Sequence, residues 1–249
     1  MDGDQLIAVL TRHPDPRLRA RAALDLGEMG YDDALEPLIT MLQHDENHLV
    51  RRDCAEGLGL LGRVEAVDAL IKAMQEDDFH YTRNEAAEAL GKLKDKRAIE
   101  PLLKFMREEE WDFARASAAL ALADLNAKET LPNILESIRK EESEFTRRDM
   151  LRAVHKFRDY SALQLLIDLV EHDESWEVRK KATEILGWLA SPQTVETLVK
   201  VLKKDMHIQV RQEAESSLRL IARDYRINYT TAEALMARKN EIPEPQINK

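Results

Sequence analysis

Residues 15–27 read DPRLRARAALDLG, and the arginine at the fifth position of this stretch returns along the chain at an unbroken spacing of 32 residues. The arginines of this column, with no insertion or deletion between them, are Arg19, Arg51, Arg83, Arg115, Arg147, Arg179 and Arg211. An internal repeat of this length is typical of stacked supersecondary units whose hydrophobic core continues from one unit to the next. The spacing therefore predicts a repeat architecture.

Apolar residues keep the same register and predict two helices in each repeat. The apolar positions of the first helix, helix A, are represented in the first repeat by Leu18, Ala22, Leu26 and Met29. Those of the second, helix B, are represented by Leu35, Leu38, Ile39 and Leu42. Both sets follow the spacing of one helical face. The sequence thus predicts an all-α, right-handed α-solenoid of about seven helix pairs.

Residues 1–13 carry only the helix B pattern and are expected to form an N-terminal half repeat. No linker interrupts residues 1–239, so we expect a single solenoid domain over that range. The chain opens on Met-Asp-Gly-Asp, without a basic segment followed by an apolar run, and no stretch approaches the ~18 apolar residues of a membrane span. We therefore expect a cytoplasmic protein.

The C-terminal part departs from the repeat. Helix A of the seventh repeat is expected to end at about Ile221, and residues 222–239 to form an irregular cap. The last helix of this cap is predicted to start at a capping box from Thr230 to Glu233. Residues 240–249 offer little to bury and are expected to be a flexible tail.

The composition fits a helical solenoid that is built without a large aromatic core. Of 249 residues, 44% are hydrophobic, 5% aromatic and 34% charged, so Leu and Ala carry most of the burial. The formal charge of -10 disfavours a nucleic-acid-binding surface, which normally carries a basic surplus. The single cysteine, Cys54, occupies the column of Ala22 and is expected to be a small buried residue rather than a nucleophile.

The repeat resembles the HEAT-like repeats of the phycobilisome lyase type, whose pattern is approximately Asp-Pro-x-Val-Arg-x-x-Ala-Ala-x-Ala-Leu-Gly. Residues 15–27 match it, and the resemblance extends from Leu6 to about Ile221. It implies that helices A lie on the convex side and helices B on the concave side. Proteins with such repeats include bilin lyases and isomerases, factors that remodel light-harvesting antennae, and scaffolds. The resemblance implies a fold and leaves the activity open.

An acidic column accompanies the arginine column. Each of its members stands six residues before the next arginine: Asp45, Asp77, Glu109, Glu141, Asp173 and Asp205. A ladder of arginines could bind phosphate, but opposite charges at every junction favour a structural ladder. We predict that each guanidinium meets the carboxylate or the helix ends of a neighbouring repeat.

The exposed columns of helix B form the first candidate binding surface. Acidic residues lie near the helix starts: Glu36, Asp68, Glu100 and Glu196. Basic residues lie near the helix ends: Lys72, Lys104, Arg107, Arg139, Lys200 and Lys203. This distribution also complements the helix dipole, which is the alternative explanation. An acidic stripe beside a basic stripe suits a folded protein or an amphipathic helix as partner.

Aromatic residues form the second candidate surface. Six of the 13 in the chain fall in the three-residue segments that precede helices A: Phe79, Tyr81, Trp111, Phe113, Phe145 and Trp176. Equivalent turns of stacked repeats lie side by side, so these residues are predicted to form a ridge of interface anchors. The alternative is that they fasten each repeat to the previous one, as apolar residues before a helix often do.

The fifth repeat deviates most, because His155 stands where the other repeats have a small residue at the helix crossing. We expect a local bend or a contact site there. Leu60, Trp188 and Leu220 share an outer column of helix A, and this apolar column predicts weak self-association through the convex face.

Motifs for chemistry are few. His44, His48 and His80 could form a fortuitous metal site, but the sequence contains no His-Glu dipeptide, glycine-rich phosphate loop or paired cysteines. We therefore predict no catalytic residue, metal or cofactor. The predicted function is a non-catalytic scaffold or assembly factor that binds a folded protein. The alternative, implied by the resemblance alone, is a bilin lyase or isomerase subunit or a phycobilisome chaperone, which would bind bilin.

Overall fold

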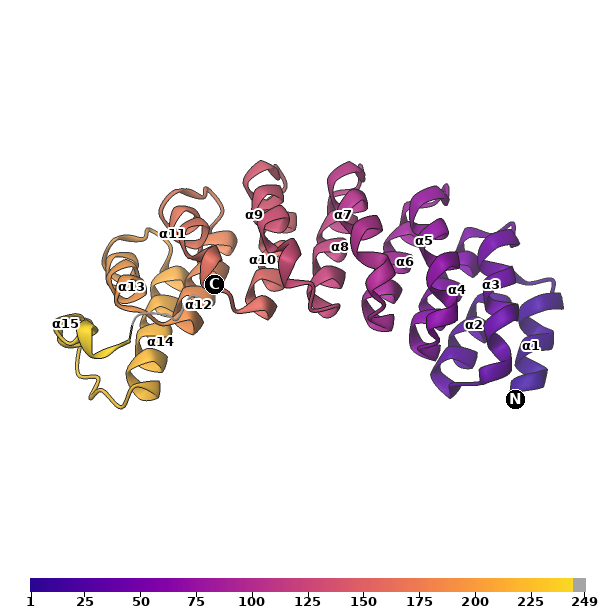
Figure 1. The fold of residues 1–249 in the computed structure, drawn as a ribbon, viewed down its shortest axis with the longest axis horizontal. Helices are drawn as coiled ribbons and strands as arrows, with labels where there is room; N and C mark the ends of the chain where they lie inside the picture. Colours follow the sequence, from indigo (N-terminus) through magenta and orange to yellow (C-terminus); the bar gives the residue numbers. More distant parts are fainter. Residues whose placement is uncertain (244–249) are drawn as a thin grey trace. The chain divides into compact units, whose positions relative to one another are not determined.

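The computed structural model describes residues 1–243, and these residues form α-helices joined by short turns and 3-10 helices, without a strand. Two compact units divide the chain, Met1–Asn133 and Ile134–Lys249. Their border falls in the first turn of helix α9 (Leu131–Lys140). Figure 1 shows the helices in chain order. The all-helical repeat predicted from the sequence is confirmed.

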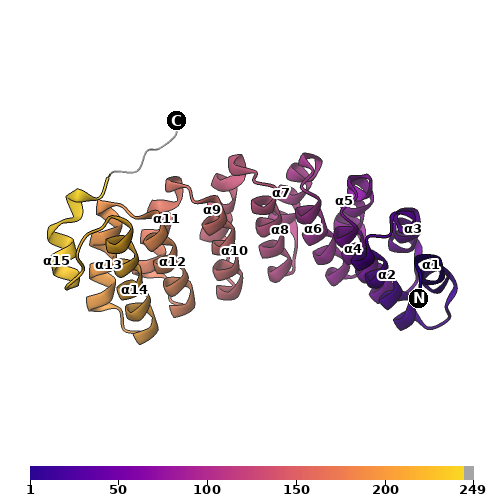
Figure 2. The same ribbon diagram turned by 90° about the horizontal axis from the view of Figure 1, so that it is seen from below.

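The first unit consists of two layers of helices. Helices B form one layer: α1 (Gly3–Arg12), α3 (Leu35–His44), α5 (Val67–Glu76) and α7 (Ile99–Glu108). Helices A form the other: α2 (Pro16–Met29), α4 (His48–Leu61), α6 (His80–Leu93) and α8 (Asp112–Asp124). Successive helices A contact one another, and so do successive helices B (Figure 2). The lone helix α1 begins the B layer, as the sequence predicts.

The second unit repeats this arrangement. Its helices B are α9, α11 (Leu163–His172) and α13 (Pro192–Lys204). Its helices A are α10 (Glu144–Phe157), α12 (Trp176–Leu189) and α14 (Ile208–Asp224). The short helix α15 (Ala232–Ala237) follows and packs against both α13 and α14, so it covers the last repeat.

Local sequence signals set the helix ends. Asp15 caps α2 by accepting a hydrogen bond from the Arg17 N–H, and Pro16 occupies the first turn. Gly30 ends the helix in the left-handed conformation, at φ 62°. A 3-10 turn then precedes the next helix B, for example at Asp32–Ala34. These short connections keep helices A and B of one repeat antiparallel.

Small residues let successive helices A approach closely. A β-carbon on Gly27 of α2 would lie 2.5 Å from the carbonyl oxygen of Gly57 on α4. In the second unit, a β-carbon on Gly187 would lie 2.6 Å from that of Ser217. His155 occupies this column on α10, where it lies half-buried. The local bend or contact site expected at this side chain stays a prediction.

The end of the chain differs from the sequence prediction in two places. The N-cap of α15 is Thr231, which accepts from the Ala234 N–H, so the helix starts one residue later than the predicted capping box. Ile242, placed in the tail by the sequence, is buried because the 3-10 turn Lys239–Glu241 packs against α13. The rest of the predicted tail, residues 244–249, lies outside the described residues.

A candidate protein-binding surface

The arginine column forms a structural ladder, as predicted. Nitrogen–oxygen distances of 2.7–2.9 Å join five arginines to carboxylates of the next repeat. These pairs are Arg19–Asp45, Arg51–Asp77, Arg83–Glu109, Arg147–Asp173 and Arg179–Asp205. All seven arginines also donate to the carbonyl oxygen six residues earlier. Their donors are therefore engaged within the fold.

The same carboxylates hold the turns that carry the aromatic residues. Asp77 accepts a hydrogen bond from the Phe79 N–H at 2.9 Å, and Glu109 accepts one from the Trp111 N–H at 3.1 Å. Burial tends to raise the pKa of Glu109, but the hydrogen bonds from Arg83 and from the Trp111 N–H outweigh it and lower the pKa. Glu109 is thus a buried anion that fixes the Trp111 turn.

Six rings of the first unit gather on these turns and on the first turns of the helices that follow, and we call them the aromatic patch: His48, Phe79, His80, Tyr81, Trp111 and Phe113. Tyr81 and Phe113 lie inside α6 and α8, not before these helices as the sequence predicted, because the helices start earlier. Rings of successive repeats touch. The Phe79 ring lies 4.0 Å from the His48 ring, and Trp111 stacks on His80 at 3.8 Å. Tyr81 stacks on Phe113 at 5.4 Å. The predicted aromatic ridge is therefore a continuous cluster within this unit.

The patch is both fastened to the fold and open to solvent. Phe79 and Phe113 are half-buried, whereas Tyr81 is 48% exposed and Trp111 is 45% exposed. The inter-repeat stacking supports the structural explanation of these residues. The exposed faces of Tyr81 and Trp111 leave room for a partner, so their binding role stays a prediction.

The two predicted aromatic residues of the second unit, Phe145 and Trp176, do not belong to this patch and have other neighbours. Phe145 is 58% exposed, and the guanidinium of Arg148 lies 5.7 Å from its ring centroid. Trp176 is half-buried and stacks on His207 of the following repeat at 4.2 Å. Both rings thus already have a cationic or aromatic neighbour from their own unit.

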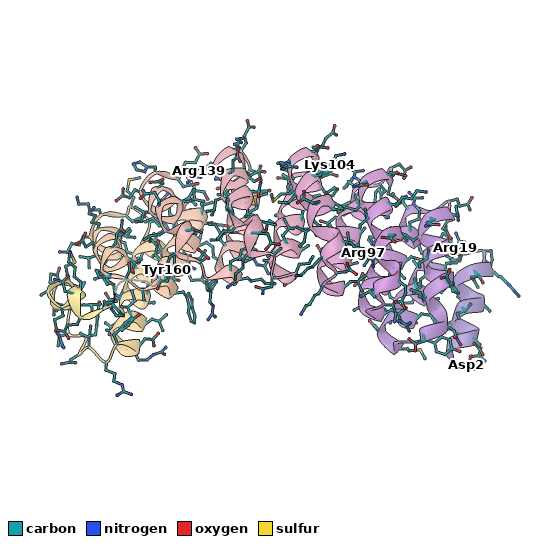
Figure 3. The ribbon with its side chains drawn as sticks, in the orientation of Figure 1. Asp2, Arg19, Arg97, Lys104, Arg139 and Tyr160 are labelled. Atoms are coloured by element: carbon teal, nitrogen blue, oxygen red, sulfur yellow. The ribbon has the colours of Figure 1, made fainter. Side chains whose placement is uncertain are left out.

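The predicted basic residues of helices B are all exposed: Lys72, Lys104, Arg107, Arg139, Lys200 and Lys203. Figure 3 shows Lys104 and Arg139 extending outward from their helices. Lys104 lines a groove of about 220 Å³ at the ends of α5 and α7. Lys200, at the equivalent position of the second unit, lines a groove of about 540 Å³ between α11 and α13.

Several of these charged residues form ion pairs within the second unit, two of them with the C-terminal cap. Lys203 lies 2.8 Å from Glu233 of α15, and Lys200 lies 3.8 Å from Glu171. The predicted acidic residue Glu196 pairs with Lys239. At the end of the second unit the acidic and basic columns therefore help to attach the cap, which the repeat pattern alone did not indicate.

The outer apolar column of helices A is also partly covered. Trp188 is exposed, but the Arg158 guanidinium lies 5.1 Å from its ring centroid, and the His155 ring lies 5.7 Å away. Leu60 is exposed and Leu220 is half-buried. Self-association through these residues stays a prediction.

Sequence reasoning considered His48 and His80 only as metal ligands and did not assign them to the aromatic surface. In residues 1–243 no cluster of three or more metal-binding side chains is found. The His48 ring instead contacts the Phe79 ring in a tilted arrangement, and the His80 ring stacks on Trp111. Their recurrence one repeat apart, beside the aromatic column, was the signal that could have indicated this role. No helix of the described part is long and apolar enough to cross a membrane.

Comparisons with known proteins agree with this geometry. HEAT repeats match residues 3–90, 42–123 and 131–219. No relative was found among curated proteins. Several solved structures have a similar fold at low sequence identity. Likeness at this level shows the fold alone.

One similar structure is the complex of CpcE and CpcF of phycocyanin lyase from Nostoc sp. PCC7120, at 22% identity and a TM-score of 0.57, covering 90% of this chain and 94% of that one. Another is YibA of Escherichia coli, at 17% identity and a TM-score of 0.64, covering 97% and 92%. Importin beta aligns at 15% identity and a TM-score of 0.67, over 96% of this chain and 36% of its own. Because HEAT repeats match most of its length, the chain belongs to the HEAT-repeat family.

Proposed function

We propose that the chain is a non-catalytic protein-binding scaffold that holds a folded partner through the aromatic patch and the basic residues of helices B. The observation that carries this proposal is the exposure of Tyr81 and Trp111, each close to half accessible, on turns fixed by buried ion pairs. Tryptophan and tyrosine are among the residues that most often contribute the binding energy at protein interfaces.

Rigidity adds to the case for binding. The rings of the patch are held by stacking and their turns by the ladder, so little side-chain freedom would be lost on association. The exposed basic residues Lys72, Lys104 and Arg107 belong to the same unit and add a charged border on helices B. The similar structure of CpcE and CpcF is a complex of two proteins, which is consistent with such use of the fold.

A tagged pull-down tests the proposal. The tagged protein is incubated with lysate of the organism that encodes it, and bound proteins are identified by mass spectrometry. A Tyr81→Ala, Trp111→Ala variant is compared with wild type and with Phe145→Ala, which removes an exposed ring of the second unit. A near-stoichiometric partner retained by wild type and Phe145→Ala but lost by the double variant is the expected result. A partner retained equally by all three proteins would contradict the role of the patch.

The second candidate, a bilin lyase subunit or antenna chaperone, is motivated by the likeness to phycocyanin lyase. A lyase subunit should bind an open-chain tetrapyrrole, whereas a scaffold should bind protein alone. Incubation with phycocyanobilin, removal of free pigment and a visible spectrum separate the two. Retained absorbance in stoichiometric amount would replace the scaffold proposal.

A further inference from the structure

We propose that the aromatic patch of the first unit binds a lysine- and arginine-rich segment of the partner protein. This inference rests on the proposed function and deepens it, because it names the chemistry that the partner must present. It is carried by three observations: the charge around the patch, the absence among the described residues of a lysine or arginine over Tyr81 and Trp111, and the arginines that lie beside rings of the second unit.

The patch is bordered by carboxylates, and its turns contain neither lysine nor arginine. The turns that carry it, residues 45–48, 77–81 and 109–113, contain no lysine or arginine. Glu46, Asp78 and Glu110 are exposed on these turns, and Asp78 and Glu110 directly precede Phe79 and Trp111. Such a border attracts cations and repels anions over several ångströms.

The nearest arginines do not offset this charge with free cations. The side chains of Arg19, Arg51 and Arg83 are at most 17% exposed, and each is bonded to a carboxylate of the next repeat. Arg115 donates to the carbonyl oxygens of Glu109 and Glu110, in the turn that carries Trp111. Arg51 also bonds to Asp78. The ladder arginines therefore act as fixed structural partners, and an incoming cation meets the remaining carboxylates and the ring faces.

Three aromatic rings of the second unit have an arginine beside them, and two of these rings, Phe145 and Trp188, are exposed. Arg148 lies over Phe145, Arg158 over Trp188 and Arg219 over Tyr229, with guanidinium-to-centroid distances of 4.8–5.7 Å. Phe145 occupies the repeat position of Tyr81 two repeats later. Among the described residues, no lysine or arginine lies over Tyr81 or Trp111, although both are about half exposed.

The patch is thus an aromatic surface of the kind that binds a cation, and within residues 1–243 no lysine or arginine covers Tyr81 or Trp111. A guanidinium or ammonium over an exposed ring raises affinity about two- to fivefold, and more when it is partly desolvated. A segment with several basic residues could engage Tyr81 and Trp111 together while its other charges meet Glu46 and Glu110. These contributions add only if the basic residues lie on one connected segment.

The test measures the affinity of a labelled 12-residue peptide of alternating arginine and glycine by fluorescence anisotropy. The matched peptide replaces every arginine with glutamine. We expect wild type to bind the arginine peptide at least about tenfold more tightly. We expect Tyr81→Ala to weaken this binding about five- to tenfold, whereas Phe145→Ala, at the equivalent repeat position, leaves it unchanged.

A second pair of variants keeps the test decisive if Tyr81→Ala does not fold. Glu46→Gln with Glu110→Gln removes two exposed charges and preserves side-chain shape, and should weaken the arginine peptide about threefold or more at low salt. In a Trp176→Phe, Trp188→Phe background, Trp111 is the sole tryptophan, and its emission should change on binding. Equal affinity for the two peptides, or equal affinity of Tyr81→Ala and Phe145→Ala for the arginine peptide, would overturn the inference.

The two proposals can fail separately. A natural partner that depends on Tyr81 and Trp111 but is not displaced by excess arginine peptide would support the scaffold and overturn the basic-segment inference. A partner that is displaced by the arginine peptide, and not by the glutamine peptide, would support both. Peptide binding at the patch, with a natural partner that ignores the patch, would support the surface chemistry and overturn the scaffold role assigned to it.

Discussion

His80 and Trp111 stack with their ring centroids 3.8 Å apart and their planes 17° from parallel, although they belong to successive repeats. The contact joins the first turn of α6 to the N-cap of α8. Trp111 nevertheless stays 45% exposed. One ring therefore fastens two repeats and presents a surface to solvent, and the two roles differ in their energetic consequences.

Trp111→Ala should cost only about 1–2 kcal/mol of unfolding free energy, because roughly half of the ring is already solvated and the stack contributes a modest amount. Phe105→Ala, at a position 6% exposed on the neighbouring α7, should cost about 3–5 kcal/mol. Urea unfolding followed by circular dichroism measures both. An equal loss in the two variants would mean that Trp111 is primarily a packing residue.

Asp173→Ala should be much more harmful than the loss of a surface ion pair. It leaves the Arg147 guanidinium, which is 10% exposed, without its carboxylate, and it removes the acceptor of the Ser175 N–H. We expect a cost of about 2–4 kcal/mol, since a buried charge loses its partner. Arg21→Ala, which breaks an exposed pair with Asp25, should stay within about 0.5 kcal/mol.

The free energies of unfolding from urea titrations of these two variants give the comparison. Replacing both Arg147 and Asp173 with leucine should recover part of the loss, because no unpaired charge remains. A loss for Asp173→Ala as small as that for Arg21→Ala would show that water solvates Arg147 adequately and that the ladder is not an important source of stability.

The repeat and its ladder could be predicted because they depend on residues that recur at a fixed spacing. The arginine beside each aromatic ring could not be predicted, since a contact such as that of Arg148 with Phe145 depends on side-chain conformation, which the repeat spacing does not determine. The burial of Ile242 depends on a 3-10 turn that follows no periodic pattern. The adjacent threonines at 230 and 231 have the same capping propensity, and the packing of α15 selects the second.

Gly27→Ala should destabilise the first unit even though alanine favours a helix. The helix propensity gain is about 1 kcal/mol. This gain is opposed by a clash. The alanine β-carbon at position 27 would lie 2.5 Å from the Gly57 carbonyl oxygen and 2.7 Å from the Gly57 Cα, so α2 and α4 must move apart. We expect a net cost of about 1–3 kcal/mol.

Thermal unfolding of Gly27→Ala beside Glu28→Ala, an exposed neighbour on the same helix, provides the measurement. Glu28→Ala gains propensity without the clash and should be neutral or slightly stabilising. A melting temperature of Gly27→Ala at or above that of wild type would show that the close approach of the two helices is dispensable.

Glu85 on α6 is an acidic residue whose side chain is largely buried. Its side chain is 16% exposed, and its nearest basic partner, Lys92, lies 3.8 Å away. Burial, followed by the neighbouring charges of Glu88 and Glu56, raises the pKa of Glu85 to about 7, against the opposing effect of Lys92 and Arg52. The folded protein therefore holds this proton more tightly than the unfolded chain does.

The sign of the pH effect follows from that difference. Below the unfolded pKa of 4.5, Glu85 is protonated in both states and has no effect. Between pH 4.5 and 7 the unfolded chain releases the proton first, so the free energy of unfolding falls as the pH rises, with the full loss reached above pH 7. Glu85→Gln, which has no charge to bury, should match wild type near pH 4 and exceed it by about 3 kcal/mol at pH 8.

Urea titrations of both proteins across this range, with the exposed Glu28→Gln as control, measure the difference. A constant offset between Glu85→Gln and wild type at every pH would assign the effect to packing and not to the proton on Glu85.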